Sequence, residues 1–118
     1  MEDINILIVE DDHNFRTIVK NYLSETKCNL FVSDGKNVMD IIKKKDVKLV
    51  LLDLGLGEID GYNVLTEIKS YDKKIKVIVQ SAYAMIEFRK KAFDLGADDF
   101  LSKPVSKSQL LKSINKLI

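Results

Sequence analysis

Acidic residues directly follow two apolar segments of the sequence. Residues 10–12 are Glu-Asp-Asp and come after the apolar residues 6–9, while Asp53 comes after the apolar residues 49–52. Neighbouring like charges repel by about 1 kcal/mol in water, and by several times more when they are partly buried. A hard divalent cation such as Mg²⁺, which takes carboxylate oxygens as ligands, would offset that repulsion. The alternative is that these acids only cap a following helix, whose N-terminus favours negative charge, and this alternative is strongest for Asp12.

A hydroxyl and a cation follow two further apolar segments. Ser81 comes after residues 75–80, and Lys103 comes after the short run 99–101. Taken singly, Ser81 fits a helix cap and Lys103 fits a surface lysine. Together with a bound metal they are the groups needed to hold a phosphoryl group, because cations neutralise its oxygens and a hydroxyl donates a hydrogen bond to one of them. A carboxylate such as Asp53 can act as the nucleophile and form an aspartyl phosphate.

The segments that must position these residues alternate between two kinds. Short β-branched runs fit strands that are buried on both faces, and they cover residues 4–9, 30–33, 47–52 and 75–80. The short run 99–101, which precedes the only proline, is the fifth strand candidate. Amphipathic stretches with helical spacing follow each of them, near residues 15–23, 38–42, 64–68, 85–95 and 110–118. This alternation predicts a parallel sheet with helices on both faces, and Ser106 is placed to cap the last helix. In the common strand order 2-1-3-4-5, the carboxyl ends of strands 1 and 3 meet at the crevice where ligands bind, so the acids would converge there.

Composition bounds the class of protein. The 118 residues predict one domain over residues 1–118, and 46% hydrophobic residues are typical of a globular chain. The net charge of +1, from 19 Lys+Arg against 18 Asp+Glu, argues against nucleic-acid binding by bulk electrostatics. A single cysteine excludes an internal disulfide framework, and no apolar run is long enough to span a membrane. The N-terminal residues lack a signal-peptide pattern, so a cytoplasmic domain is expected.

Taken together, these residues resemble the receiver domain of two-component response regulators, over residues 4–118. The resemblance depends on five motifs in the family's order: Ile-Val-Glu-Asp-Asp at 8–12, Leu-Leu-Asp-Leu at 51–54, Asp-Gly at 60–61, Val-Gln-Ser-Ala at 79–82 and Gly-Ala-Asp-Asp-Phe-Leu-Ser-Lys-Pro at 96–104. The resemblance implies a flavodoxin-like, doubly wound (βα)₅ fold, with a parallel five-stranded sheet of order 2-1-3-4-5.

The resemblance also implies a role for each acid. Asp53 matches the phosphorylated aspartate. Asp11 matches the direct Mg²⁺ ligand, and Glu10 matches the second acid, which acts through water. The backbone carbonyl of Gly55 completes the metal contacts that the family makes. Phosphorylation and its reversal would therefore depend on Mg²⁺ as the cofactor.

Three further residues receive roles from the same resemblance. Ser81 matches the hydroxyl residue that moves toward the phosphate, and Lys103 matches the lysine that contacts the phosphate. Phe100 matches the switch aromatic, which turns inward when the hydroxyl moves toward the phosphate. The peptide bond between Lys103 and Pro104 is cis in the family, which would aim the lysine at the site.

Partners also follow from the resemblance. The phosphoryl donor would be a sensor histidine kinase or a phosphotransfer domain, and the domain would be no enzyme beyond promoting its own phosphorylation and dephosphorylation. Phosphorylation would switch a face formed by helix 4, strand 5 and helix 5, toward a downstream effector protein, a fused output domain or a second copy in a phosphorylation-dependent dimer. Neither direct nucleic-acid binding nor a membrane is expected. The charged residues expected on that face are Lys90, Lys91, Asp98, Lys107 and Lys112.

The sequence departs from the family's pattern near the phosphorylation site. Gly57 stands where family members usually carry proline, and with Gly55 it should loosen the loop after Asp53. Gly55 also leaves no side chain beside the phosphoryl group, and Tyr83, two residues after Ser81, is bulky. In the family, the positions of Gly55 and Tyr83 influence how easily water reaches the aspartyl phosphate. The lifetime of the phosphorylated form is therefore left open.

Three other functions compete with this hypothesis. A pseudo-receiver that no longer uses phosphate would bind no Mg²⁺. A flavodoxin-like cofactor binder would need a Ser/Thr/Gly-rich phosphate loop after the first strand, where the acids at 10–12 would repel a phosphate instead. An aspartate-dependent phosphatase would carry a second Asp two residues after the first, whereas Gly55 occupies that position.

Overall fold

The computed structural model describes residues 3–118 and consists of alternating strands and helices. Residues 1 and 2 belong to the N-terminal segment that lacks a signal-peptide pattern, and they lie outside the described residues. Five strands are β1 (Asn5–Val9), β2 (Asn29–Ser33), β3 (Leu49–Asp53), β6 (Lys76–Ser81) and β7 (Asp99–Ser102). Five helices are α1 (His13–Tyr22), α2 (Val38–Lys45), α3 (Gly61–Tyr71), α4 (Ile86–Asp94) and α5 (Lys107–Leu117). Between β3 and α3 lie the two-residue strands β4 (Gly55–Leu56) and β5 (Ile59–Asp60).

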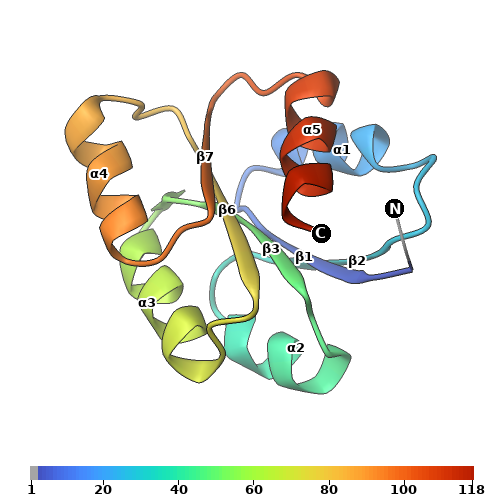
Figure 1. Cartoon of the computed structure of the whole chain (residues 1–118), viewed down its shortest axis with the longest axis horizontal. Coiled ribbons are helices and arrows are strands. Elements are labelled where there is room, and N and C mark those ends of the chain that lie inside the picture. The colour runs from blue at the N-terminus through green and yellow to red at the C-terminus, as the bar shows by residue number, and fades with distance from the viewer. Residues whose placement is uncertain (1–2) are drawn as a thin grey trace.

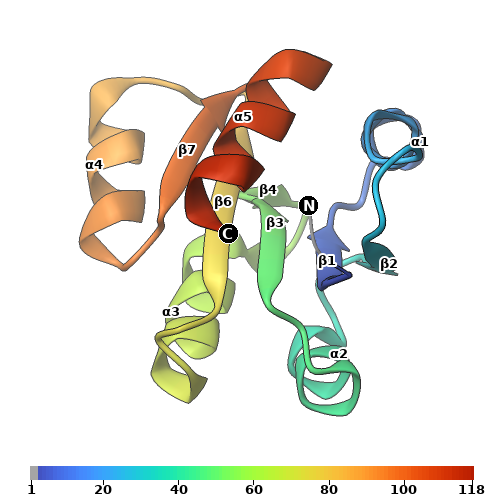
Figure 2. The same ribbon diagram turned by 45° about the vertical axis from the view of Figure 1, so that its right-hand side comes forward.

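The sheet has the predicted order. All four neighbouring pairs are parallel, and the five long strands run β2-β1-β3-β6-β7, which is 2-1-3-4-5 when only these strands are numbered. Figure 1 shows α1 and α5 together on one side of the sheet, with α2 and α3 on the other. Figure 2, turned by 45°, shows α4 beside β7 on the side of α3. The fold class predicted from the sequence is confirmed.

Two apolar cores hold the helices against the sheet. Because successive strand residues point to opposite faces, Leu51 and Ile78 pack with α1 and α5, whereas Leu52 and Val79 pack with α2, α3 and α4. Every residue of β3 is buried, as expected for the central strand of a sheet covered on both faces. No helix within residues 3–118 combines the length and the apolar character that crossing a membrane requires.

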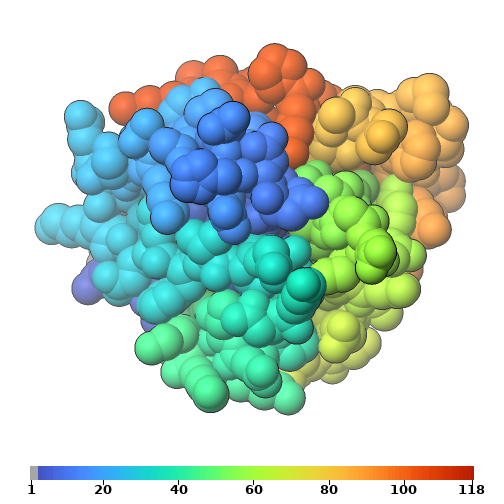
Figure 3. Space-filling model, turned by 180° about the vertical axis from the view of Figure 1, so that it is seen from behind, coloured from blue at the N-terminus to red at the C-terminus, as the bar shows by residue number. Residues whose placement is uncertain are grey.

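The segment after Asp53 differs from the loosened loop that two glycines predicted. Strands β4 and β5 pair as an antiparallel hairpin, with Gly55 opposite Asp60 and Leu56 opposite Ile59. Gly57 lies at its turn with φ +67°, a conformation that glycine adopts without steric cost, and Leu56 is buried against the α2–α3 core. The glycine therefore allows a tight turn here. The space-filling view in Figure 3 shows the start of α1 next to this hairpin, and a Cβ on Gly57 would lie 3.7 Å from Asp11 Oδ2.

Asp99 ties the edge strand β7, which leads to Lys103, to helix α5. Its carboxylate accepts hydrogen bonds from the Ser113 hydroxyl, from the Phe100 backbone N–H at 2.8 Å and from Lys116 Nζ at 3.2 Å. Burial alone would raise the pKa of Asp99, but these donors and the Lys116 charge outweigh it and hold the pKa below the ordinary value of 3.8. Helix α5 itself starts at the predicted cap, because Ser106 forms a capping box with Gln109.

Replacing Gly61 should destabilise the chain strongly. A Cβ at this position would lie 2.6 Å from Leu54 Cα and 2.9 Å from Leu54 O, so Gly61→Ala must displace backbone, at a cost of roughly 1–3 kcal/mol. Urea unfolding measures this loss. Gly55→Ala is the matched control, because its nearest contact would be 3.9 Å away, and equal unfolding midpoints for the two variants would contradict the account.

The Asp99 cluster predicts a pH-dependent contribution to stability. Because the folded pKa is lowered, the contribution is present above the ordinary value of 3.8 and is lost as the pH falls through the folded pKa. We expect Asp99→Asn to lower the free energy of unfolding by about 1 kcal/mol at pH 7 and by progressively less below pH ~4. Urea titrations across this range measure the difference. Asp94→Asn, which removes only an exposed pair with Lys90, is the control and should stay near wild type throughout.

Candidate functional site

Three carboxylates converge where the strand order reverses. The chain leaves β1 for β2 on one side and returns to β3 on the other, so the carboxyl ends of β1 and β3 border one crevice. Asp53 ends β3, and Glu10 and Asp11 follow β1. Each of the three offers a carboxylate oxygen within 4.8 Å of the others. Glu10 and Asp53 are buried, at 2% and 7% exposure, whereas Asp11 faces solvent.

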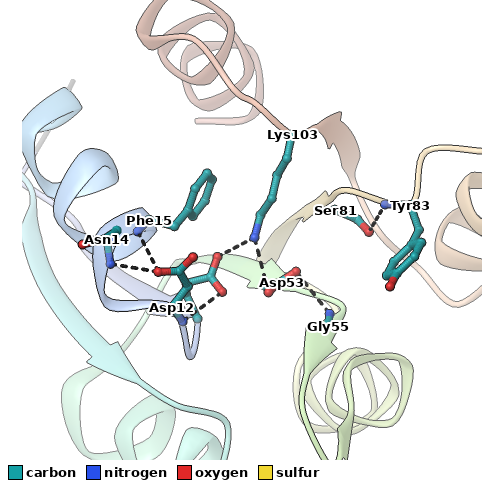
Figure 4. A network of polar contacts seen from close by, with 9 residues as sticks. Asp12, Asn14, Phe15, Asp53, Gly55, Ser81, Tyr83 and Lys103 are labelled. Atoms are coloured by element: carbon teal, nitrogen blue, oxygen red, sulfur yellow. Dashed lines mark hydrogen bonds and ion pairs between the residues drawn. The ribbon is translucent and has the colours of Figure 1, made fainter.

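The Asp53 carboxylate contacts one hydrogen-bond donor and one cation. The backbone N–H of Gly55 donates to Oδ1 at 3.1 Å, and Lys103 Nζ lies 3.4 Å from Oδ2. Figure 4 shows this arrangement, with Lys103 reaching toward Asp53 from the segment that follows β7. One oxygen is thus fixed by the backbone of the β4–β5 hairpin, and the other faces the only cation within 4 Å of it among the described residues.

Lys103 lies closer to Glu10 than to Asp53. Its Nζ donates to Glu10 Oε1 at 2.7 Å and lies 4.1 Å from the centre of the Phe15 ring, an arrangement in which the ring's negative face attracts the ammonium. Its backbone N–H donates to Ser81 O at 2.9 Å, and the bond to Pro104 is cis, as the resemblance implied. The ion pair with Glu10 is a contact that the sequence reasoning did not foresee.

The electrostatics of the crevice are dominated by its acids. Burial and the neighbouring Asp53 raise the pKa of Glu10 and Lys103 lowers it, and together these effects place the pKa at about 7, above the ordinary value of 4.5. One lysine cannot neutralise three carboxylates. All three carboxylates offer oxygen ligands, which hard divalent cations prefer, so the donor set fits such an ion better than it fits a soft metal.

Asp12 takes the ordinary role that the sequence left open for it. Its carboxylate accepts from the backbone N–H of Asn14 at 2.9 Å and of Phe15 at 3.4 Å, which makes it the N-cap of α1. Because the cap fixes the start of α1, it also fixes the position of Phe15 beside Lys103 (Figure 4).

Ser81 and Phe100 are both buried. Ser81 Oγ accepts from the backbone N–H of Tyr83 at 3.0 Å, and Figure 4 shows it on the side of Asp53 away from Asp12. Helix α4 begins only at Ile86 with Met85 as its N-cap, so Ser81 does not cap it. Phe100 is 3% exposed, with the guanidinium of Arg89 lying 5.0 Å from its ring centre.

One buried polar residue beside the crevice escaped the sequence reasoning. Gln80 precedes Ser81 on β6, is 2% exposed and pairs in register with Asp53. Its amide oxygen has no hydrogen-bond partner. The signal in the sequence was a single polar residue inside the otherwise apolar run 75–80.

Comparisons with known proteins agree on one family. The family model for the response regulator receiver domain matches residues 6–115. The cell cycle response regulator CtrA of Brucella ovis is 29% identical over 116 residues, covering 98% of this chain and 50% of the relative. The chain thus spans about half the length of the curated relatives it matches.

Solved structures give the same fold. The signal receiver domain of a DNA-binding response regulator protein (merR) from Colwellia psychrerythraea 34H is 26% identical, with a TM-score of 0.89 and 98% of both chains covered. NtrX from Brucella abortus, in complex with ADP, is 28% identical with a TM-score of 0.90, covering 98% of this chain and 27% of that one.

Proposed function

The chain belongs to the response regulator receiver domain family, whose members act in two-component signalling. We propose that Asp53 is the phospho-acceptor of this domain. The observation that carries the proposal is the placement of the Asp53 carboxylate. It is buried, one oxygen is held by the Gly55 N–H, and the other faces a lysine within a group of three acids. Gly55 stands where an aspartate-dependent phosphatase would need its second Asp, which disfavours that alternative.

The proposed reaction is a displacement at phosphorus. Asp53 Oδ2 attacks the phosphorus atom of a phosphohistidine, on a sensor histidine kinase or a phosphotransfer domain. The new O–P bond forms as the P–N bond breaks, and the departing imidazole keeps the electron pair. Lys103 neutralises charge on the transferred group, and the Ser81 hydroxyl donates a hydrogen bond to one of its oxygens.

Glu10, Asp11, Asp53 and the Gly55 carbonyl are the groups that would hold Mg²⁺. When bound, the ion supplies positive charge that offsets the developing charge on the phosphoryl oxygens. Asp11, which is exposed, is the acid that is free to bind it directly. Glu10 is buried and already paired with Lys103 at 2.7 Å, which suits a supporting role through water.

Switching would start from the Ser81 hydroxyl. Moving Oγ toward the phosphoryl group breaks its hydrogen bond with the Tyr83 N–H and so releases the turn that leads into α4. Phe100, which is already buried beneath Arg89, is the switch residue that would respond on β7. The face that changes is formed by α4, β7 and α5.

That face would bind an effector protein, a fused output domain or, after phosphorylation, a second copy of the domain. The length of the curated relatives, about twice that of this chain, supports an output domain. Of the charged residues expected there, Asp98 is held by Lys69 Nζ at 2.8 Å and by the Val77 N–H, so it supports the fold of the face. The near-zero net charge favours a protein partner over nucleic acid.

Incubation with acetyl phosphate and Mg²⁺ should add the mass of one phosphoryl group to the protein. Intact-mass spectrometry measures the gain, and peptide mapping should place it on Asp53. We expect Asp53→Asn or chelation by EDTA to abolish it, because one removes the nucleophile and the other the cation. Asp12→Asn, which keeps a capping side chain, is the matched control and should keep the gain. A gain that survives both Asp53→Asn and EDTA would contradict the proposal.

Mg²⁺ should also stabilise the folded chain without any phosphoryl donor. A cation present at ten times its Kd adds about 1.4 kcal/mol, which raises Tm by roughly 4–8 °C for a domain of this size. Asp11→Asn should remove most of this increase, while raising the metal-free Tm because it relieves repulsion in the crevice. Thermal unfolding followed by circular dichroism measures both values. An equal Mg²⁺-induced increase in wild type and Asp11→Asn would exclude Asp11 as the direct ligand.

A further inference from the structure

Gln80 presents an unpaired polar group next to the phospho-acceptor. It is buried to 2% exposure at the carboxyl end of β6, and its Oε1 has no hydrogen-bond partner. It is the only such side-chain atom among the described residues. An unpaired acceptor is a cost to the fold, and an apolar side chain of the same shape would avoid it.

The register of the sheet places Gln80 on the strand between Asp53 and the segment that carries Lys103. Gln80 pairs with Asp53 on β3 and with Leu101 on β7. Directly paired residues of neighbouring parallel strands point to the same face, about 5 Å apart, and Lys103 follows Leu101 by two positions. The face is that of α1 and α5, because Leu51, Ile78 and Leu101 all pack there.

The chemistry of the two neighbours leaves one complementary arrangement. An ionised Asp53 only accepts hydrogen bonds and Lys103 only donates them, whereas a carboxamide does both. Gln80 can therefore donate from Nε2 to Asp53 while Oε1 accepts from Lys103. In the present structure neither bond is formed: Gln80 Oε1 has no partner, and Lys103 Nζ lies 2.7 Å from Glu10 Oε1 and 3.4 Å from Asp53 Oδ2.

We propose that Gln80 is a positioning residue for phosphoryl transfer, which spans Asp53 and Lys103 when the lysine leaves Glu10 for the phosphoryl group. Its Oε1 then receives one ammonium hydrogen, which leaves another directed at the phosphoryl oxygens. Its Nε2 donates a hydrogen bond to the Asp53 carboxyl group and so holds that group in place. The inference rests on the proposed phospho-acceptor function and adds to it a residue that acts through Lys103 and Asp53.

Gln80→Met tests the proposal, because methionine is close to glutamine in shape and cannot form either bond. We expect its rate constant for phosphorylation by acetyl phosphate with Mg²⁺ to fall roughly ten-fold, the effect of losing one hydrogen bond to a charged group. Its urea midpoint should equal or exceed that of wild type, since no unpaired acceptor is buried. Slow phosphorylation of a stable variant separates positioning from folding.

Gln109→Met is the matched control, because Gln109 lies in the α5 capping box outside the crevice. It should lose stability and keep the wild-type rate constant, which is the opposite pattern. A second readout follows the side-chain amide of Gln80 by ¹H–¹⁵N NMR, with its signal identified by its loss in Gln80→Met. That signal should shift on phosphorylation, while that of Gln109 should stay in place.

The outcomes distinguish this inference from the function on which it rests. If wild type gains no phosphoryl group at Asp53, the proposed function and this inference both fall. If wild type and Gln80→Met are phosphorylated at the same rate, or if the Gln80 amide signal does not move, the positioning role alone is overturned and Gln80 only fills space.

Discussion

Everything at the carboxyl edge of this sheet depends on one electrostatic imbalance, in which a single ammonium faces three carboxylates. Burial of Glu10 and Asp53 removes the water that would otherwise screen them. Lys103 is held near both acids by its contact with Phe15 and by its backbone hydrogen bond to Ser81, and its Nζ lies 2.7 Å from Glu10 and 3.4 Å from Asp53. The donor set of the site therefore fits a divalent cation, and the function proposed for it adds a group that spreads negative charge over several oxygens.

The surrounding fold holds these charges at short range against their repulsion. The buried strand β3 fixes Asp53, and the hairpin after it returns a backbone N–H to the same carboxylate. Gly61 lets α3 start directly against the backbone of Leu54, the residue that follows Asp53. The N-cap at Asp12 removes one acid from the crevice by giving it hydrogen bonds of its own.

Much of this could be predicted from the sequence, because the relevant signals are local. Most of the long strands lie in short, largely apolar runs of the sequence. The acids, Ser81 and Lys103 stand at or just after the ends of the strands, so the topology alone brings them together. Which acid Lys103 prefers was not predictable, since it depends on burial and on the Phe15 ring from another helix. The hairpin after Asp53 was missed because Gly57 was taken for flexibility, whereas its positive φ closes a turn over buried Leu56.

The link from Asp99 to helix α5 makes the chemistry at the crevice and events at the outer surface thermodynamically reciprocal. The same short strand that leads to Lys103 is bound through Asp99 to Ser113 and Lys116, so α5 and the lysine share one support. A partner that binds more tightly to one position of α5 must also stabilise the state of Asp53, with or without a phosphoryl group, that goes with this position. That state of Asp53 strengthens the binding of the partner by the same factor. In the function proposed here, the domain's partner would therefore also be a ligand that sets how much of the phosphoryl group Asp53 retains.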